Sequence, residues 1–154
     1  MEYLIVKWLH VLSSTFLFGT GVGSAFYLLF TSLSRDVRAI AVVARYVVIA
    51  DWLFTTPTIV LQPLTGLRLT QLIGTPLHAQ WLAWSIALFV LAALCWLPVV
   101  FIQIRMRDLA RHAAAEQGTL PQRYWRYLAW WVVLGTVAFF LFVAIFYLMV
   151  AKPL

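Results

Sequence analysis

The chain has 154 residues, of which 64% are hydrophobic and only 10% charged, and its formal net charge is +6. A water-soluble domain carries about 25% charged residues, so this composition excludes a soluble core and predicts a chain whose solvent is lipid. The positive charge does not indicate a nucleic-acid partner, because most of it lies in two short connections between apolar segments.

The first predicted helix covers residues 3–33 and holds His10 and three closely spaced glycines in otherwise apolar sequence. About 20 apolar residues suffice to cross the hydrocarbon layer of a membrane. The run is too long for a secretion signal and no small-residue cleavage site follows it, so we expect it to be retained. At helical spacing Ser14, Leu17, Gly21 and Ser24 share a face with His10, which we interpret as a column of mostly small side chains below the imidazole.

The second predicted helix covers residues 39–73 and carries a polar stripe: Asp51, Thr55, Thr58 and Gln62. A polar stripe avoids lipid, so we expect it to point into a helix bundle. Counting about 1.5 Å per residue from the outer end of the first helix and the inner end of the second places His10 and Asp51 at one level in the outer half of the membrane. A hydrogen bond between them is therefore expected. Two prolines, Pro57 and Pro63, should interrupt this helix.

The third and fourth predicted helices cover residues 80–104 and 127–151. Thr75 and Pro76 have the pattern of a helix start, which would place His78 in a first turn at the outer side. The third helix should extend beyond the membrane until Gly118 stops it. Tryptophans near the ends of spans are expected to be interfacial anchors without chemistry: Trp8, Trp81, Trp84, Trp130 and Trp131.

Four spans place the two arginine-rich connections on the same side, and that side is expected to be the cytoplasm. The arginines concerned are Arg35, Arg38, Arg105, Arg107, Arg111, Arg123 and Arg126. The prediction is an all-α, polytopic four-transmembrane-helix bundle, a single integral membrane domain over residues 1–154 with both termini outward. We expect a multi-pass protein of the bacterial inner (plasma) membrane that contacts membrane lipid, with a homo-oligomer or a larger membrane complex left open.

Two histidines, an aspartate and a glutamine beside a groove of small side chains suit a flat, apolar, metal-bearing ligand, and haem b is the expected cofactor. His10 is the expected axial ligand of the iron, with either His78 as a second ligand or an open or weakly held sixth position. Asp51 is expected to orient the imidazole and to accept a proton. The remaining expected contacts are Ser14, Gly21, Thr55 and Gln62 around the macrocycle and Arg68 at its propionates.

Simpler interpretations stay open. Small residues also let helices pack closely, and serine and threonine often bond only to their own backbone. The glycine face would then dock onto a larger membrane complex, which makes the chain a non-catalytic subunit or assembly partner. A metal transporter ranks last, because three methionines and one cysteine, Cys95, offer no soft ligand pair.

Short motifs in all four segments resemble the HemJ-type protoporphyrinogen oxidase pattern, and they resemble still more an uncharacterised family of predicted integral membrane proteins with the same layout. These motifs are WLHVLSSTFLFGTGVGSAFYL (8–28), TTPTIVLQPLTGLRL (55–69), PLHAQWLAWSIAL (76–88) and VAKP (150–153). The resemblance implies a small helical membrane protein that binds b-type haem and oxidises a porphyrinogen- or quinol-like substrate. It places the family's first-span histidine at His10.

Two positions depart from the HemJ-type pattern. Gln80 stands where that family has a lysine in a leucine–histidine–alanine–lysine motif, and the AFYLLF segment lacks the family's further histidine. Glutamine would hold a substrate carboxylate less well than lysine. Whether the chain is an enzyme therefore stays open at this stage, with a haem-dependent oxidoreductase as the version to test.

Overall fold

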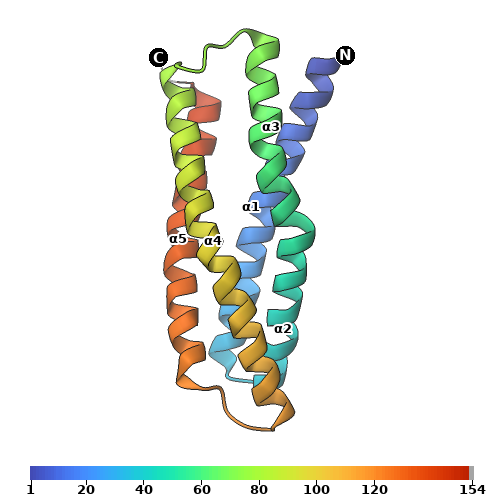
Figure 1. Ribbon diagram of the computed structural model, residues 1–154, viewed down its shortest axis with the longest axis vertical. Helices are drawn as coiled ribbons and strands as arrows, with labels where there is room; N and C mark the ends of the chain where they lie inside the picture. Colours follow the sequence, from blue (N-terminus) through green and yellow to red (C-terminus); the bar gives the residue numbers. More distant parts are fainter. Residues whose placement is uncertain (153–154) are drawn as a thin grey trace.

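In the computed structural model residues 1–152 are described, and all regular structure in that part of the chain is helical. The helices lie side by side in one elongated bundle (Figure 1), which confirms the all-α prediction. Three of them are long and apolar enough to cross a membrane: α1 (Glu2–Ser34), α4 (Gln80–Ala115) and α5 (Gln122–Ala151).

The segment predicted as the second span is helical throughout but irregular in the middle. It consists of α2 (Val37–Ala50), one π-helical turn η1 (Asp51–Thr55) and α3 (Thr56–Ile73), in direct succession. Pro57 has no N–H to donate to the carbonyl of Leu53, and the N–H of Thr56 reaches back to the carbonyl of Asp51 in the wider π register. Pro63 lies inside α3 without ending it, so only one of the two expected interruptions is present.

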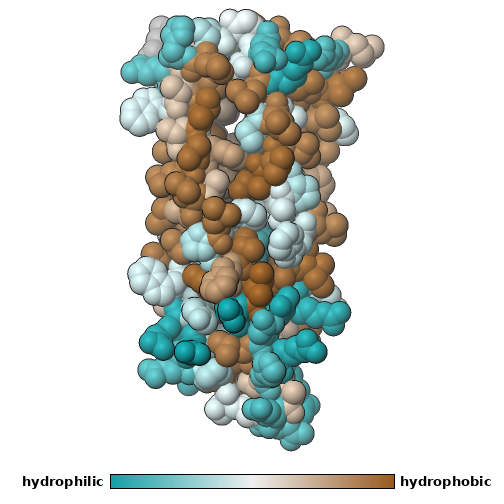
Figure 2. Space-filling view, in the orientation of Figure 1, coloured by the Kyte–Doolittle hydropathy of each residue, from teal (hydrophilic) through white to brown (hydrophobic). Residues whose placement is uncertain are grey.

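Figure 1 shows that the start of α1, the end of α5 and the loop between α3 and α4 lie at one end of the bundle, called here the terminal end. The connections at 35–36 and 116–121 lie at the other end, as Figure 1 shows. We call it the basic end because five arginines lie in these connections or within five residues of them: Arg35, Arg38, Arg111, Arg123 and Arg126. Figure 2 shows a broad hydrophobic surface between hydrophilic residues at both ends. This distribution is that of a protein embedded in lipid.

Two helix boundaries differ from the prediction. Thr75 and Pro76 do not begin α4; α3 ends at Gly74 with a φ of 68°, a tight turn follows in which the N–H of Ala79 bonds to the carbonyl of Pro76 (3.0 Å), and α4 starts at Gln80. At its other end α4 extends beyond residue 104 as expected. After α4 ends at Ala115, the residue with a left-handed backbone conformation is Gln117 (φ 53°) and not the expected Gly118.

The tightest packing lies near the basic end. Leu28, Ile40, Met106 and Tyr124 are completely buried there, and the Tyr124 hydroxyl forms a 2.7 Å hydrogen bond with the hydroxyl of Ser32. Toward the terminal end α1 packs on α3 and α4 packs on α5. Between these two helix pairs the bundle is hollow, and this hollow holds the second of the two sites described next.

Candidate functional site

The first site surrounds His10 near the terminal end. The Nδ1 atom of His10 is 2.8 Å from Thr65 Oγ1. The Thr65 hydroxyl donates its own hydrogen to the carbonyl of Leu61 (2.6 Å), so it accepts from the imidazole. Nδ1 therefore carries the proton, and the lone pair of the ring is on Nε2.

Two further contacts hold this ring and its helix in place. A Cβ atom added to Gly66 would lie 3.3 Å from Cε1 of His10, so the glycine provides the space in which the imidazole lies. One turn further along α1, the buried Ser13 hydroxyl donates to Oε1 of Gln62 on α3. We call His10, Ser13, Gln62, Thr65 and Gly66 the imidazole site.

An exposed ion pair joins α1 and α3 at the terminal end. Arg68 Nε donates to Glu2 Oε1 at 2.7 Å. Arg68, expected to meet haem propionates, thus already has a carboxylate partner, and it is exposed at the terminal end. α1 and α3 run antiparallel, and the contacts of His10 with Thr65 and of Ser13 with Gln62 share one register, three residues forward on α1 and three back on α3.

The expected hydrogen bond between His10 and Asp51 is wrong. Asp51 precedes Thr65 by 14 residues, which separates it from the imidazole site by about 20 Å along the helix. Its Oδ2 instead accepts a 2.7 Å hydrogen bond from Nε2 of Gln103 on α4. Gln103 lies two residues before Arg105 in the sequence. The depth count failed because the helices extend well beyond 30 Å, so their first residues do not mark one common membrane boundary.

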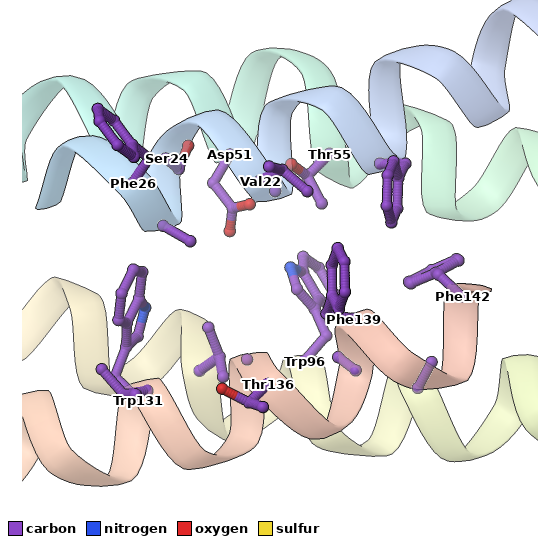
Figure 3. A pocket seen from close by; sticks show the side chains of 18 of the residues that line it. Val22, Ser24, Phe26, Asp51, Thr55, Trp96, Trp131, Thr136, Phe139 and Phe142 are labelled. Atoms are coloured by element: carbon purple, nitrogen blue, oxygen red, sulfur yellow. The ribbon is translucent and has the colours of Figure 1, made fainter. Parts of the chain in front are cut away.

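The second site is a cavity of about 540 Å³ between α1, η1, α4 and α5. Asp51 is the charged residue in its wall, and the rest is mostly aromatic and aliphatic. Figure 3 shows Asp51 on one side of the space and the indole rings of Trp96 and Trp131 on the other. We call this space the Asp51 cavity.

Two buried polar atoms in the wall of the cavity have no hydrogen-bond partner among residues 1–152. They are Oγ1 of Thr55, whose side chain is 4% exposed, and Nε1 of Trp96. A buried N–H or O–H without a partner is uncommon in proteins, since leaving it unpaired costs about 1–3 kcal/mol. Both groups can donate to a molecule held between them.

The wall of the cavity reaches the surface of the bundle on α1 and α5, which indicates a sideways opening there. Phe26 on α1 and Phe140 on α5 line it and are 55% and 63% exposed on the hydrophobic surface of the bundle. Gly21 and Gly135 line it from the same two helices, and a Cβ added to either would meet nothing within 4 Å. Gly21 therefore provides open space and not a close helix contact within the described chain.

The residues expected to form one site are thus divided among several places. Gln62 joins His10, Gly21 and Thr55 join Asp51, and Ser14 bonds only to the carbonyl of Val11 in its own helix (2.7 Å). His78 is exposed in the loop at the terminal end, so its role as a second axial ligand stays a prediction. The inward direction of the polar stripe is confirmed for Thr55 and Thr58, which are buried.

Several important residues were not expected from the sequence. Thr65 continues the stripe after Gln62 at the next i+3 step and was detectable by that spacing. Gln103 is a polar residue in an apolar run, also a detectable signal. Trp131, expected to be an interfacial anchor, is buried instead and donates to Gln103 Oε1 at 3.4 Å; nothing in the spacing of the tryptophans distinguishes it from Trp130.

Comparison with known proteins gives one match. Residues 4–153 match the model of a family described as "Predicted integral membrane protein (DUF2269)". No match was found among the curated proteins or among the solved structures.

Proposed function

From the premise that the chain belongs to the DUF2269 family of predicted integral membrane proteins, we propose that it is a haem-binding redox protein of the HemJ kind in the bacterial inner membrane. His10 is the axial ligand of a b-type haem in this proposal. The observation that carries it is the 2.8 Å contact of His10 Nδ1 with Thr65, because this contact leaves the lone pair of Nε2 available for a metal.

The proposed topology has four crossings, with residues 37–73 as the second one. Two observations support this topology. These residues form one unbroken succession of helical turns, and the polar stripe that points inward accounts for their lower hydropathy relative to α1, α4 and α5. The basic end would face the cytoplasm and both termini would face outward, because positively charged connections are retained on the cytoplasmic side.

The residues around His10 fit one axial ligand. Thr65 fixes the tautomer and orientation of the ring, Gly66 makes room for it, and the Ser13–Gln62 bond ties the two helices together beside it. Bound haem would supply one-electron chemistry at this place. Asp51 lies about 20 Å away, so its proposed role as a proton acceptor applies to a porphyrinogen- or quinol-like molecule in the cavity and not to one held at His10.

Optical spectra of the purified protein, expressed with ample haem, test this proposal. We expect a Soret band that shifts on reduction and is lost in His10→Ala, while the exposed His112→Ala serves as the control and keeps it. His78→Ala decides between one and two axial ligands, because it alters the spectrum only in the second case. A wild-type protein without any haem absorbance would refute the proposal.

One observation favours a second candidate function, that of a non-catalytic subunit. Gly19 and Gly23 are spaced as in close helix–helix contacts, yet a Cβ added to either would meet nothing within 4 Å. This face of α1 is free to receive a helix of another membrane protein. If it does, Gly19→Leu abolishes co-purification of a stoichiometric partner in mild detergent, and a colourless complex that survives this change would count against the idea.

A further inference from the structure

The Asp51 cavity presents polar groups of opposite kinds to the same space. Thr55 Oγ1 and Trp96 Nε1 lie near the Asp51 carboxyl group but form no hydrogen bond with it or with any other group of residues 1–152, so each offers a donor. The hydrogen bond that Asp51 accepts, from Gln103, engages Oδ2, which leaves Oδ1 as an acceptor. A ligand that satisfies this set needs an oxygen that accepts and a hydroxyl that donates. Hydroxyl and carbonyl oxygens on a compact ring provide both.

Gln103 fixes the acceptor but cannot serve the ligand itself. Its Nε2 donates to Asp51 and its Oε1 accepts from the indole of Trp131, so both ends of the amide are used. The side chain is only 3% exposed. Asp51 is thus held in position from α4 and α5 with one carboxyl oxygen left toward the cavity.

The walls match a flat, apolar ring. Trp96, Trp131 and Phe139 stand around the space that Asp51 points into (Figure 3). Aromatic side chains contact one another and planar ligands in stacked or edge-on geometries, beyond the simple burial of area. No histidine, methionine, cysteine, tyrosine or lysine is in the described wall, so the residues there do not fit haem, which needs an axial ligand.

The opening leads to lipid and not to water. It lies between Phe26 and Phe140, within the hydrophobic surface of the bundle. A molecule that enters here must be dissolved in the membrane, and an alkyl or isoprenoid tail would extend from the ring through the gap between α1 and α5. The ring would then lie near the level of Gln103 and Asp51, about 20 Å along the helices from the connections at the basic end.

We infer that the Asp51 cavity binds a lipid-soluble quinol or quinone. The quinol hydroxyl donates to Asp51, and the oxygen of either form accepts from Trp96 and Thr55. An organic cation would also be attracted to one carboxylate among aromatic rings. It would leave both unpartnered donors unsatisfied, which is why the quinol class is favoured. The inference rests on the proposed function for the role of Asp51 and decides between the two substrate classes named there, but it concerns a different site from His10 and does not require haem to be bound.

Binding to the full-length protein in lipid nanodiscs tests this inference, with empty nanodiscs as the reference for partition. The probes share a ten-carbon tail: a benzoquinol, its dimethyl ether, which cannot donate, and a trimethylammonium compound. We expect the wild-type protein to bind the quinol at least about tenfold more tightly than the ether, since a hydrogen bond to a charged group has this strength. In Asp51→Asn this preference should fall to about twofold.

Filling the cavity provides the matched control. Gly21→Phe places a ring in the cavity, whereas Gly19→Phe adds the same ring two residues away on the same helix, outside the cavity wall and in equally open surroundings. We expect the first variant to lose binding of the quinol and the second to keep it within about twofold. His10→Ala should also keep it, so a failure of the haem proposal would be distinguishable.

Three results would overturn the inference. The first is equal binding of quinol and dimethyl ether to the wild-type protein. The second is unchanged binding in Gly21→Phe while the protein remains folded. The third is preferred binding of the trimethylammonium probe, which would make the cavity a site for organic cations.

Discussion

The imidazole site and the Asp51 cavity differ in how their polar groups are satisfied. At the imidazole site the Thr65 hydroxyl both accepts from His10 and donates to Leu61, and Gln62 accepts from Ser13. In the cavity Thr55 and Trp96 are buried without partners in the described chain. Both sites use threonines of one polar stripe, separated by 10 residues, with opposite results.

This difference separates two uses of polar residues in a lipid-embedded bundle. Polar groups that form hydrogen bonds between helices favour one register of those helices, because donor and acceptor meet only when the helices are at that relative height. Groups left unsatisfied beside an open space add nothing to that register. In our proposal they serve a molecule that enters the space. Equivalent substitutions at both sites therefore test whether the two sites differ in this way.

Glycine substitutions should give the largest contrast. Gly66→Leu introduces a side chain where even a Cβ lies 3.3 Å from His10, and we expect a loss of about 2–3 kcal/mol in unfolding free energy. Gly21→Leu has open space around it and should change that free energy by less than about 0.5 kcal/mol. Titration with denaturing detergent in mixed micelles measures both; equal losses would remove the distinction.

Gln103→Leu should give the next largest loss in unfolding free energy. It deprives Asp51 and Trp131 of their hydrogen-bond partner at once, with an expected loss of about 2 kcal/mol in unfolding free energy. The exposed Gln122→Leu at the start of α5 is the control and should be almost neutral. Unchanged stability of Gln103→Leu would mean that this residue does not fix Asp51.

The same threonine substitution should have different effects at the two sites. Thr65→Val removes two hydrogen bonds and should lower the unfolding free energy by about 1 kcal/mol. Thr55→Val removes an unpartnered hydroxyl of nearly the same shape, so the ligand-free protein should be unchanged or slightly more stable. A clear loss in Thr55→Val without ligand would show that its hydroxyl is satisfied within the protein.

The smallest contrast concerns neighbouring serines. Ser13→Ala breaks a bond between α1 and α3 and should lower the unfolding free energy by about 0.6 kcal/mol. Ser14 bonds only to Val11 of its own helix, so Ser14→Ala should have no measurable effect. The reverse order would place Ser14 and not Ser13 at the contact with α3.

The helices and the polar stripe were predictable because composition and spacing express them locally. The 30-residue scale of α1, α4 and α5 follows from apolar runs, and the burial of Thr55 follows from helical spacing. The pairing of His10 with Thr65 was not, because the level of one helix against another depends on distant contacts such as Glu2 with Arg68. The interruption of the helix before Pro57 was predictable from the missing N–H of the proline, but its π register was not, because the proline alone does not determine which carbonyl the N–H of Thr56 reaches.

Cross-linking of paired cysteines tests the central claim, that the two sites are separate, most directly. In a Cys95→Ser background, His10→Cys combined with Thr65→Cys should be joined by a short bifunctional thiol reagent, while His10→Cys combined with Asp51→Cys should not. Mass spectrometry of the digested protein identifies the linked peptides. Efficient linkage of positions 10 and 51 would contradict the account, because it would bring the imidazole and the carboxyl group to one level of the bundle.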